Sequence, residues 1–203
     1  MLATVLATAT TLGACGHDGA TAPTGPGSAE SATVLEAEPA HRAGAPRPEP
    51  PVALRLPSGT AVRVRPATTL RSGRLDVPDD IDEAGWWRGG ARIGDPFGSI
   101  LVAGHVDAAD QGLGAFAELL GVRAGTAVRV RSRHLEQTFR VRSLRLVPRD
   151  RVRDTVAVSS VRGPRRLTLV TCAPPYLPAE GGYQNLAVVT AVPTGDARTR
   201  SGS

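Results

Sequence analysis

Two residues able to do covalent chemistry each follow an apolar, β-branched run in this 203-residue chain. His105 ends the run SILVAGH, and Cys172 ends the run LTLVTC just before Pro174 and Pro175. A free thiol with a pKa of about 8.5 is only a few per cent ionised at neutral pH, and a nearby imidazole raises that fraction. If both strands end at one edge of a barrel, His105 and Cys172 form a nucleophile with its acid/base. Spacing alone leaves open the alternative that Cys172 is a small buried apolar residue.

The second cysteine, Cys15, stands in a different context. It follows Leu12-Gly13-Ala14 and an uncharged, mildly apolar stretch over residues 2–12, which is too short to span a bilayer but has the length of a signal-peptide core. The tetrapeptide resembles a bacterial lipobox, in which a peptidase cuts before a cysteine that carries lipid. Residues 1–12 lack a basic residue, which leaves a plain apolar tail as the alternative. We predict a signal segment over 1–15, a lipid anchor at Cys15 and an extracytoplasmic protein tethered to the membrane.

The charge pattern argues against several functions. All 24 basic residues are arginines, and the formal net charge is +5. The absence of lysine from the sequence excludes lysine Schiff-base chemistry. Arginines alternate with valines at 62–65, 128–131 and 140–142, as expected of solvated strand faces, and no nucleic-acid-binding motif accompanies them. His134, in the polar segment RSRHLE, is predicted to be a solvated surface residue. No acidic cluster indicates a metal site, and we predict no cofactor.

Composition divides the rest of the chain. Residues 16–51 are rich in Ala, Pro and Gly and are predicted to be a disordered linker, and residues 194–203 a disordered tail. The folded domain is expected over 52–193. Strand signals outnumber helical ones, which predicts a mainly β barrel or sandwich. Strands are expected at 61–64, 99–103, 127–130, 138–147, 166–170 and 186–192, and helical turns at 79–85 and 116–120.

Three motifs together carry a family resemblance. The segments GHVD at 104–107, GLGAFAELL at 112–120 and LTLVTC at 167–172 resemble, in this order, the sortases, which are cysteine transpeptidases of the bacterial surface. The resemblance extends over about 54–193, and residues 74–107 are similar to the class F sortases of actinobacteria. It implies a closed eight-stranded β-barrel with short helices, a histidine after the fourth strand, a cysteine at the end of the seventh and an arginine on the eighth.

The resemblance also implies an activity. In this family the cysteine attacks the Thr–Gly bond of an LPxTG-like sorting signal, and an amine from the cell wall or a pilin resolves the thioacyl enzyme. Cys172 would then be the nucleophile, and His105 the acid that protonates the leaving amine. Thr171 matches the threonine before the family's nucleophile and is expected to help hold the oxyanion. Such an enzyme is expected to act as a monomer.

One position departs from the family pattern. Relatives read Tyr-Arg-Asp-Asn where this chain reads YQNL at 183–186, so Gln184 stands in place of the arginine. An amide donates a hydrogen bond without charge, and charge-assisted bonds are roughly twice as strong. Either activity is weaker, or another arginine, such as Arg88 or Arg92, serves. Gln184 remains a candidate for substrate positioning. The rival hypothesis is a catalytically weak module of the same fold that only binds cell-wall or surface-protein ligands.

Overall fold

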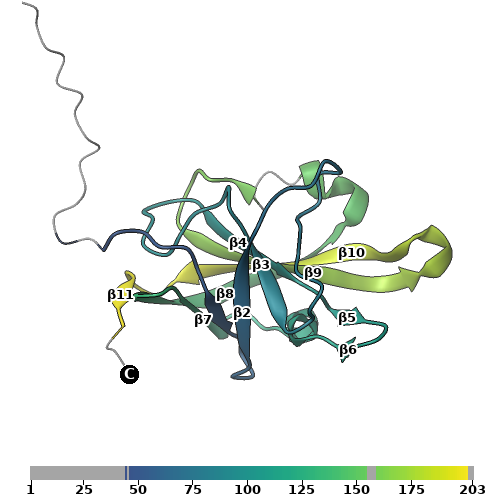
Figure 1. The fold of residues 1–203 in the computed structure, drawn as a ribbon, viewed down its shortest axis with the longest axis horizontal. Coiled ribbons are helices and arrows are strands. Elements are labelled where there is room, and N and C mark those ends of the chain that lie inside the picture. The colour runs from purple at the N-terminus through teal and green to yellow at the C-terminus, as the bar shows by residue number, and fades with distance from the viewer. Residues whose placement is uncertain (1–43, 45, 155–158, 201–203) are drawn as a thin grey trace, which may run out of the picture. The chain divides into compact units, whose positions relative to one another are not determined.

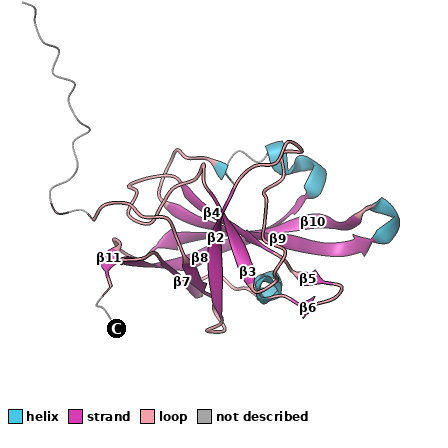
Figure 2. Cartoon of the chain, viewed as in Figure 1, coloured by secondary structure: helices cyan, strands magenta, loops and turns pink. Residues whose placement is uncertain are grey.

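The computed structural model describes residues 44, 46–154 and 159–200. The predicted signal segment, Cys15 and most of the predicted linker lie outside the described residues. The elements are β1 (Ala53–Arg55), β2 (Ala61–Ala67), β3 (Glu83–Trp87), β4 (Ser99–Gly104), β5 (Asp107–Ala108), β6 (Gly112–Leu113), η1 (Ala115–Gly121), β7 (Ala127–Arg131), β8 (Leu135–Pro148), η2 (Arg149–Asp154), β9 (Arg166–Leu177), η3 (Pro178–Glu180), β10 (Gly182–Pro193) and β11 (Arg198–Thr199), where η marks a 3-10 helix (Figures 1 and 2).

Eight of these strands close into a barrel. They pair in the order β10-β9-β4-β3-β2-β1-β7-β8, and β8 pairs again with β10. The predicted closed, eight-stranded, mainly β fold is therefore confirmed. Each of the six predicted strands lies within an observed one, and the helical turn expected at 116–120 lies within η1. The strands β5 and β6 form a separate small hairpin.

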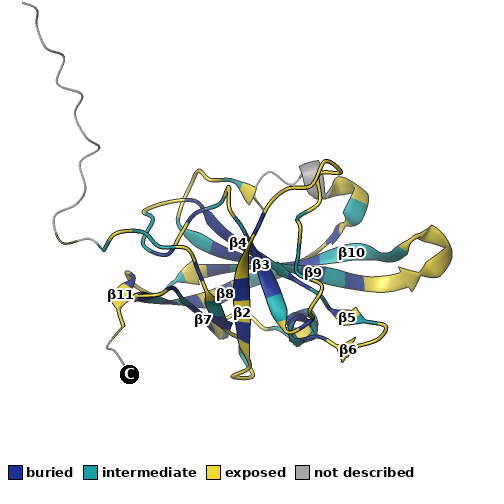
Figure 3. Cartoon of the chain, in the orientation of Figure 1, coloured by how far each residue is buried: buried dark blue, intermediate teal, exposed yellow. Residues whose placement is uncertain are grey.

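Alternation along the strands explains the arginine-rich sequence. In β2, Val62 and Val64 are buried in the barrel, whereas Arg63 and Arg65 are exposed. The same alternation holds in β7, where Val128 and Val130 enter the core (Figure 3). Successive residues of a strand point to opposite faces, so each arginine lies on the outer face of the sheet. The prediction of solvated arginine faces is confirmed for these strands.

The helical turn expected at 79–85 is wrong. The strand β3 begins at Glu83 and lies between β2 and β4. A Cβ added at Gly85 would lie 2.9 Å from Cβ of Ala67, so the two strands approach closely there. Ala84 and Trp86 are buried on one face, as the period of a strand requires. Pairing on both sides therefore outweighs the weak local helical signal.

The folded part extends beyond the predicted 52–193 at both ends. Residues 194–200, expected to be a disordered tail, pack instead on the barrel. Ala197 joins the core with 7% of its surface exposed, and Arg198 pairs with Glu136 of β8. At the other end, Glu49 forms a bridge with Ile93. Polar composition did not reveal either contact, because each depends on a partner distant in the sequence.

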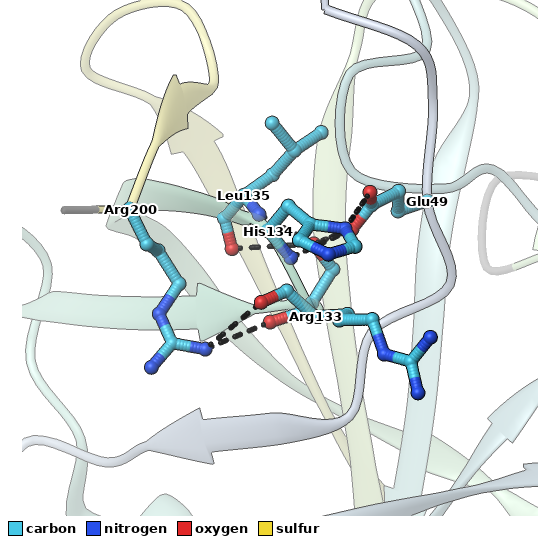
Figure 4. Close-up of polar contacts among 6 residues, drawn as sticks. Glu49, Arg133, His134, Leu135 and Arg200 are labelled. Carbon is cyan, nitrogen blue, oxygen red and sulfur yellow. Dashed lines mark hydrogen bonds and ion pairs between the residues drawn. The ribbon is translucent and has the colours of Figure 1, made fainter. Parts of the chain in front are cut away.

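Glu49 holds the N-terminal segment on the turn between β7 and β8 (Figure 4). Its carboxylate accepts hydrogen bonds from the Ser132 hydroxyl and from the backbone N–H of His134, and its Oε1 lies 2.8 Å from Nδ1 of His134. These contacts, that of Ser132 foremost, lower the pKa of Glu49 to about 2. Arg200 donates to the carbonyl oxygens of Ser132 and Arg133 in the same turn. The His134 side chain is 63% exposed, as predicted, but it is paired rather than only solvated.

Candidate active site

Two neighbouring parallel strands lead to His105 and Cys172. The register of β4 and β9 runs from Ser99↔Arg166 to Ala103↔Val170. His105 and Cys172 each stand two residues beyond that last pair. Strand neighbours lie about 4.8 Å apart, and residues in register share a face of the sheet. His105 and Cys172 therefore follow neighbouring strands at equal distances along the chain from the last pair of the ladder.

Cys172 does not end its strand, in contrast to the expectation from Pro174 and Pro175. The strand β9 continues to Leu177, with a cis peptide bond between the prolines, and Cys172 pairs with Leu186 of β10. What ends near Cys172 is the pairing with β4. Past that point β9 still pairs with β10, which itself pairs with β8 as far as Asn185↔Pro148, and the hairpin extends beyond (Figure 1).

The Cys172 thiol is half-buried, and its ionisation reflects opposing effects. Burial raises the pKa of the thiol, and the positive charges of Arg149 and then Arg74 lower it. The negative charge of Asp107 adds to the rise. The net shift is upward, so the thiol is mostly protonated at neutral pH. Attack by this sulfur therefore requires a base that removes the proton.

His105 is fixed through its ring and its backbone. Nε2 lies 3.0 Å from the carbonyl oxygen of Pro78, in the loop between β2 and β3. A carbonyl oxygen only accepts, so Nε2 carries the hydrogen and Nδ1 is left for proton transfer. Gly104 has no space for a side chain, because a Cβ there would lie 2.7 Å from the buried Phe116 ring. In the described part of the chain the His105 ring makes no hydrogen bond to Cys172.

Thr171 lies on the other face of β9. Its side chain is 2% exposed, and alternation directs it to the interior, away from the face of Cys172. Its hydroxyl oxygen is buried and has no hydrogen-bond partner among the described residues. A role of Thr171 in holding the oxyanion stays a prediction.

Gln184 is turned onto its own hairpin. It stands alone between the pairs of Tyr183 and Asn185, opposite a bulge of β9 that contains Pro174 and Pro175. Its amide donates to the carbonyl oxygens of Gly182 at 2.6 Å and Glu180 at 3.4 Å. The amide hydrogens are therefore engaged within the hairpin. Gln184 lines a surface pocket of about 480 Å³ that Arg149, Asp150 and Asn185 also line.

Sequence reasoning missed Arg149. This residue follows β8 directly, and its Nη1 donates to the carbonyl oxygens of Tyr183 at 2.9 Å and Gly181 at 3.2 Å. Within the described residues it has no carboxylate partner. Arg149 and Arg74, and not Arg88 or Arg92, are the arginines whose charges act on the Cys172 thiol. The sequence gives no signal for them, because both stand among many arginines and reach the site only through the fold.

Sequence reasoning also missed the pair of Asp107 and Tyr183. The Tyr183 hydroxyl donates to Oδ2 of Asp107 at 2.6 Å. This hydrogen bond to a carboxylate raises the pKa of Tyr183 to about 12. The Tyr183 ring meets the Tyr176 ring edge to face, with centroids 4.9 Å apart. The position of Asp107 two residues after His105, within GHVD, was the available signal.

Two further properties concern metals and membranes. Over the described residues, no group of three or more His, Cys, Asp or Glu side chains is arranged to hold a metal ion. Among the helices that the structure describes, none combines the length and the apolar character needed to cross a bilayer.

The chain thus forms a closed barrel in which a histidine and a cysteine each stand two residues beyond the last pair of two neighbouring parallel strands. The sortase domain model matches residues 60–194, and the chain belongs to the sortase family. Among solved structures, the chain is similar to the SrtA sortase of Actinomyces oris (22% identity, 80% of this chain and 93% of that one, TM-score 0.56). It is also similar to sortase E1 of Streptomyces coelicolor, solved with a tripeptide in the active site (17% identity, 75% and 91%, TM-score 0.55). Sortase A of Listeria monocytogenes matches at 15% identity, with coverage of 76% and 92% and a TM-score of 0.54. No curated protein matches the chain.

Proposed function

We propose that the protein is an extracytoplasmic cysteine transpeptidase of class F type, which cleaves an LPxTG-like sorting signal and transfers the acyl group to an amine or to water. The observation that supports the proposal is that His105 and Cys172 each stand two residues beyond the last pair of the parallel strands β4 and β9. A nucleophile and an acid/base must lie within reach of one scissile bond, and their position after neighbouring strands supports that arrangement.

The reaction follows from these two side chains. His105 takes the thiol proton through Nδ1, and the Cys172 sulfur attacks the carbonyl carbon of the Thr–Gly bond. The tetrahedral oxyanion collapses as His105 returns the proton to the leaving glycine amine, which leaves a thioester on Cys172. An acceptor amine then attacks the thioester and gives its proton to His105, and the thiolate departs.

Gln184 stands where the family pattern has an arginine, and Arg149 lines the same surface pocket as Gln184. Because the Gln184 amide is bonded to its own hairpin, we propose that Arg149 supplies the positive charge beside the reacting carbonyl. A preorganised donor of this kind is commonly worth about 100- to 1000-fold in rate. The rival, a weak enzyme that mainly binds its ligand, is favoured only by the absence of charge at Gln184.

The test is to incubate the purified chain with LPxTG peptides and an amine. A thioester on Cys172, seen by mass spectrometry and abolished by Cys172→Ala, is the expected result. His105→Ala is expected to retain peptide binding and to lose cleavage. Binding of peptides without any cysteine-dependent cleavage, across several signal variants, would instead favour the binding module.

The location is a separate proposal. We propose that lipid on Cys15 tethers the protein outside the cell, with the part of the predicted linker 16–51 that precedes Glu49 as the spacer. Mass spectrometry of membrane fractions tests this, and an unmodified Cys15 retained in the mature protein would contradict it.

A further inference from the structure

The sheet hydrogen bonds that join β4 and β9 end before the reacting residues. The last pair is Ala103↔Val170, and both His105 and Cys172 lie beyond it. From His105 the chain enters the small hairpin of β5 and β6, whereas from Cys172 it continues into the long hairpin of β9 and β10 (Figure 1). The barrel ladder therefore does not by itself set the position of His105 relative to Cys172.

One side-chain hydrogen bond links the segments that follow His105 and Cys172. Among the described residues, the bond from the Tyr183 hydroxyl to Oδ2 of Asp107, 2.6 Å long, is the hydrogen bond between segment 105–113 and the hairpin of β9 and β10. Asp107 begins β5, two residues after His105. Tyr183 lies on β10 and pairs with Tyr176 of β9. The bond thus joins the two segments just past the reacting residues.

Tyr183 is itself held from two sides. Its ring meets the Tyr176 ring at an interplanar angle of 72°. Its carbonyl oxygen accepts a hydrogen bond from Arg149 at 2.9 Å. The carboxylate of Asp107 raises the pKa of Tyr183 to about 12, so the hydroxyl remains a donor at any ordinary pH. Hydrogen bonds to charged groups are roughly twice as strong as neutral ones, which makes this link firm.

We propose that Tyr183 is a positioning residue, which through its hydrogen bond to Asp107 fixes the segment of His105 relative to the hairpin of Cys172. The inference rests on the proposed function, because a proton that passes between His105 and the group bound to Cys172 requires a fixed spacing. A misplacement of about 1 Å costs roughly 100-fold in rate. Tyr183 acts through Asp107 and is not assigned contact with the substrate.

The experiment compares four variants of the full chain: Tyr183→Phe, Asp107→Ala, the two combined, and Tyr176→Phe as the control. The Tyr176 side chain is exposed, and its hydroxyl has no hydrogen bond in the part of the chain that the structure describes. The measurements are kcat and KM for LPxTG cleavage, the NMR resonance of the His105 ring, assigned with His105→Ala, and the urea midpoint. The midpoint separates a loss of folding from a displaced histidine.

We expect Tyr183→Phe and Asp107→Ala each to lower kcat by about 10- to 100-fold with KM little changed, and to shift the His105 resonance. The double variant should be no worse than Asp107→Ala alone, because that substitution already removes the bond. Tyr176→Phe should leave kcat and the resonance unchanged. Additive effects, or an unmoved His105 resonance in Tyr183→Phe, would overturn the inference.

The two proposals fail in distinguishable ways. If the wild-type chain cleaves no peptide, the proposed function fails, and the His105 resonance alone decides the inference. A shift in Tyr183→Phe and Asp107→Ala but not in Tyr176→Phe supports the link. If cleavage falls in Tyr183→Phe while the resonance stays in place, Tyr183 acts in another way and the inference is wrong.

Discussion

Nη1 of Arg149 donates a hydrogen bond to the carbonyl oxygen of Tyr183 at 2.9 Å, which ties the residue after β8 to the hairpin that carries Cys172. The Arg149 charge is the leading electrostatic effect that lowers the pKa of the Cys172 thiol, against the larger effect of burial. The guanidinium uses Nη1 for the hairpin, and its Nη2 and Nε make no hydrogen bond to the residues that the structure describes. Arg149 therefore serves both the hairpin and the charge of the site.

The first prediction concerns Arg149→Gln. Loss of the cation removes an effect that favours the thiolate, so the thiol pKa should rise further. The rate of Cys172 alkylation by iodoacetamide at pH 7 should fall severalfold, and its pH profile should move to higher pH. The matched control is Arg145→Gln, because Arg145 is exposed on β8 and does not act on the thiol. An equal effect of both variants would mean that only the net charge matters.

Gln184→Arg tests the departure from the family pattern. If Arg149 already supplies the charge, this substitution should change the cleavage rate of the wild type by less than about threefold. In the Arg149→Gln background it should restore part of the lost rate, because one donor of this kind is worth about 100-fold or more. The measurement is the rate of LPxTG peptide cleavage in the presence of an amine, for each variant and for the wild type. A large gain in the cleavage rate in the wild-type background would show that Arg149 does not supply the positive charge.

The third prediction concerns Thr171, whose hydroxyl lies in the interior. Its replacement should change stability and activity in opposite directions. A buried polar group without a partner costs about 1–3 kcal/mol, so Thr171→Val should leave the free energy of unfolding unchanged or raise it. If Thr171 helps to hold the oxyanion, cleavage should fall about tenfold or more. Thr168→Val is the control, because the Thr168 hydroxyl is bonded to Ser99 at 2.6 Å and its loss should destabilise. Unchanged cleavage in Thr171→Val would end the oxyanion hypothesis.

Local sequence was sufficient for a mainly β fold and for most of its strands, whereas the closed eight-stranded barrel was implied by the family resemblance. Alternating valines and arginines indicate β2 and β7, and the runs before His105 and Cys172 indicate β4 and β9, because burial on one face leaves a period of two in the sequence. The strand at Glu83–Trp87 was missed because its pairing depends on the close approach of Gly85 and Ala67. The local sequence does not indicate that these two residues, far apart in the chain, will be in contact.

Only those candidate site residues that stand in recognisable sequence motifs were predicted. His105 and Cys172 carry recognisable types and spacing, whereas Arg149 and Tyr183 reach the site through tertiary contacts. Gln184 was a candidate for substrate positioning, and its amide donates instead to Gly182, at a bulge where Pro174 and Pro175 of β9 lie opposite it. A bulge changes the direction of one side chain without changing the apolar pattern, so the sequence does not disclose it.

Gly104→Ala tests how the backbone before His105 is fixed. The new Cβ would lie 2.7 Å from the ring of Phe116, which is fully buried and cannot move aside freely. Overpacking of this kind costs about 1–3 kcal/mol in the free energy of unfolding. Gly121→Ala is the matched control, since no atom lies within 4 Å of a Cβ there. Urea denaturation of both variants gives the comparison, and an equal effect would contradict the packing argument.

The last prediction concerns acid and the N-terminal segment. The pKa of Glu49 is about 2 in the folded protein, against 4.5 for the free side chain, because Ser132 and His134 donate to the carboxylate. A lowered pKa means that this stabilisation is fully present above about pH 4.5 and is lost as the pH falls towards 2. Glu49→Gln should therefore lower the free energy of unfolding at pH 7 by about 1–2 kcal/mol, since the carboxylate is partly solvated. The difference from wild type should shrink below pH 4.5. The control is Glu180→Gln, which changes an exposed carboxylate and should have no such effect. If the difference between Glu49→Gln and wild type persisted unchanged at pH 2.5, the charge of Glu49 would not be what holds the segment.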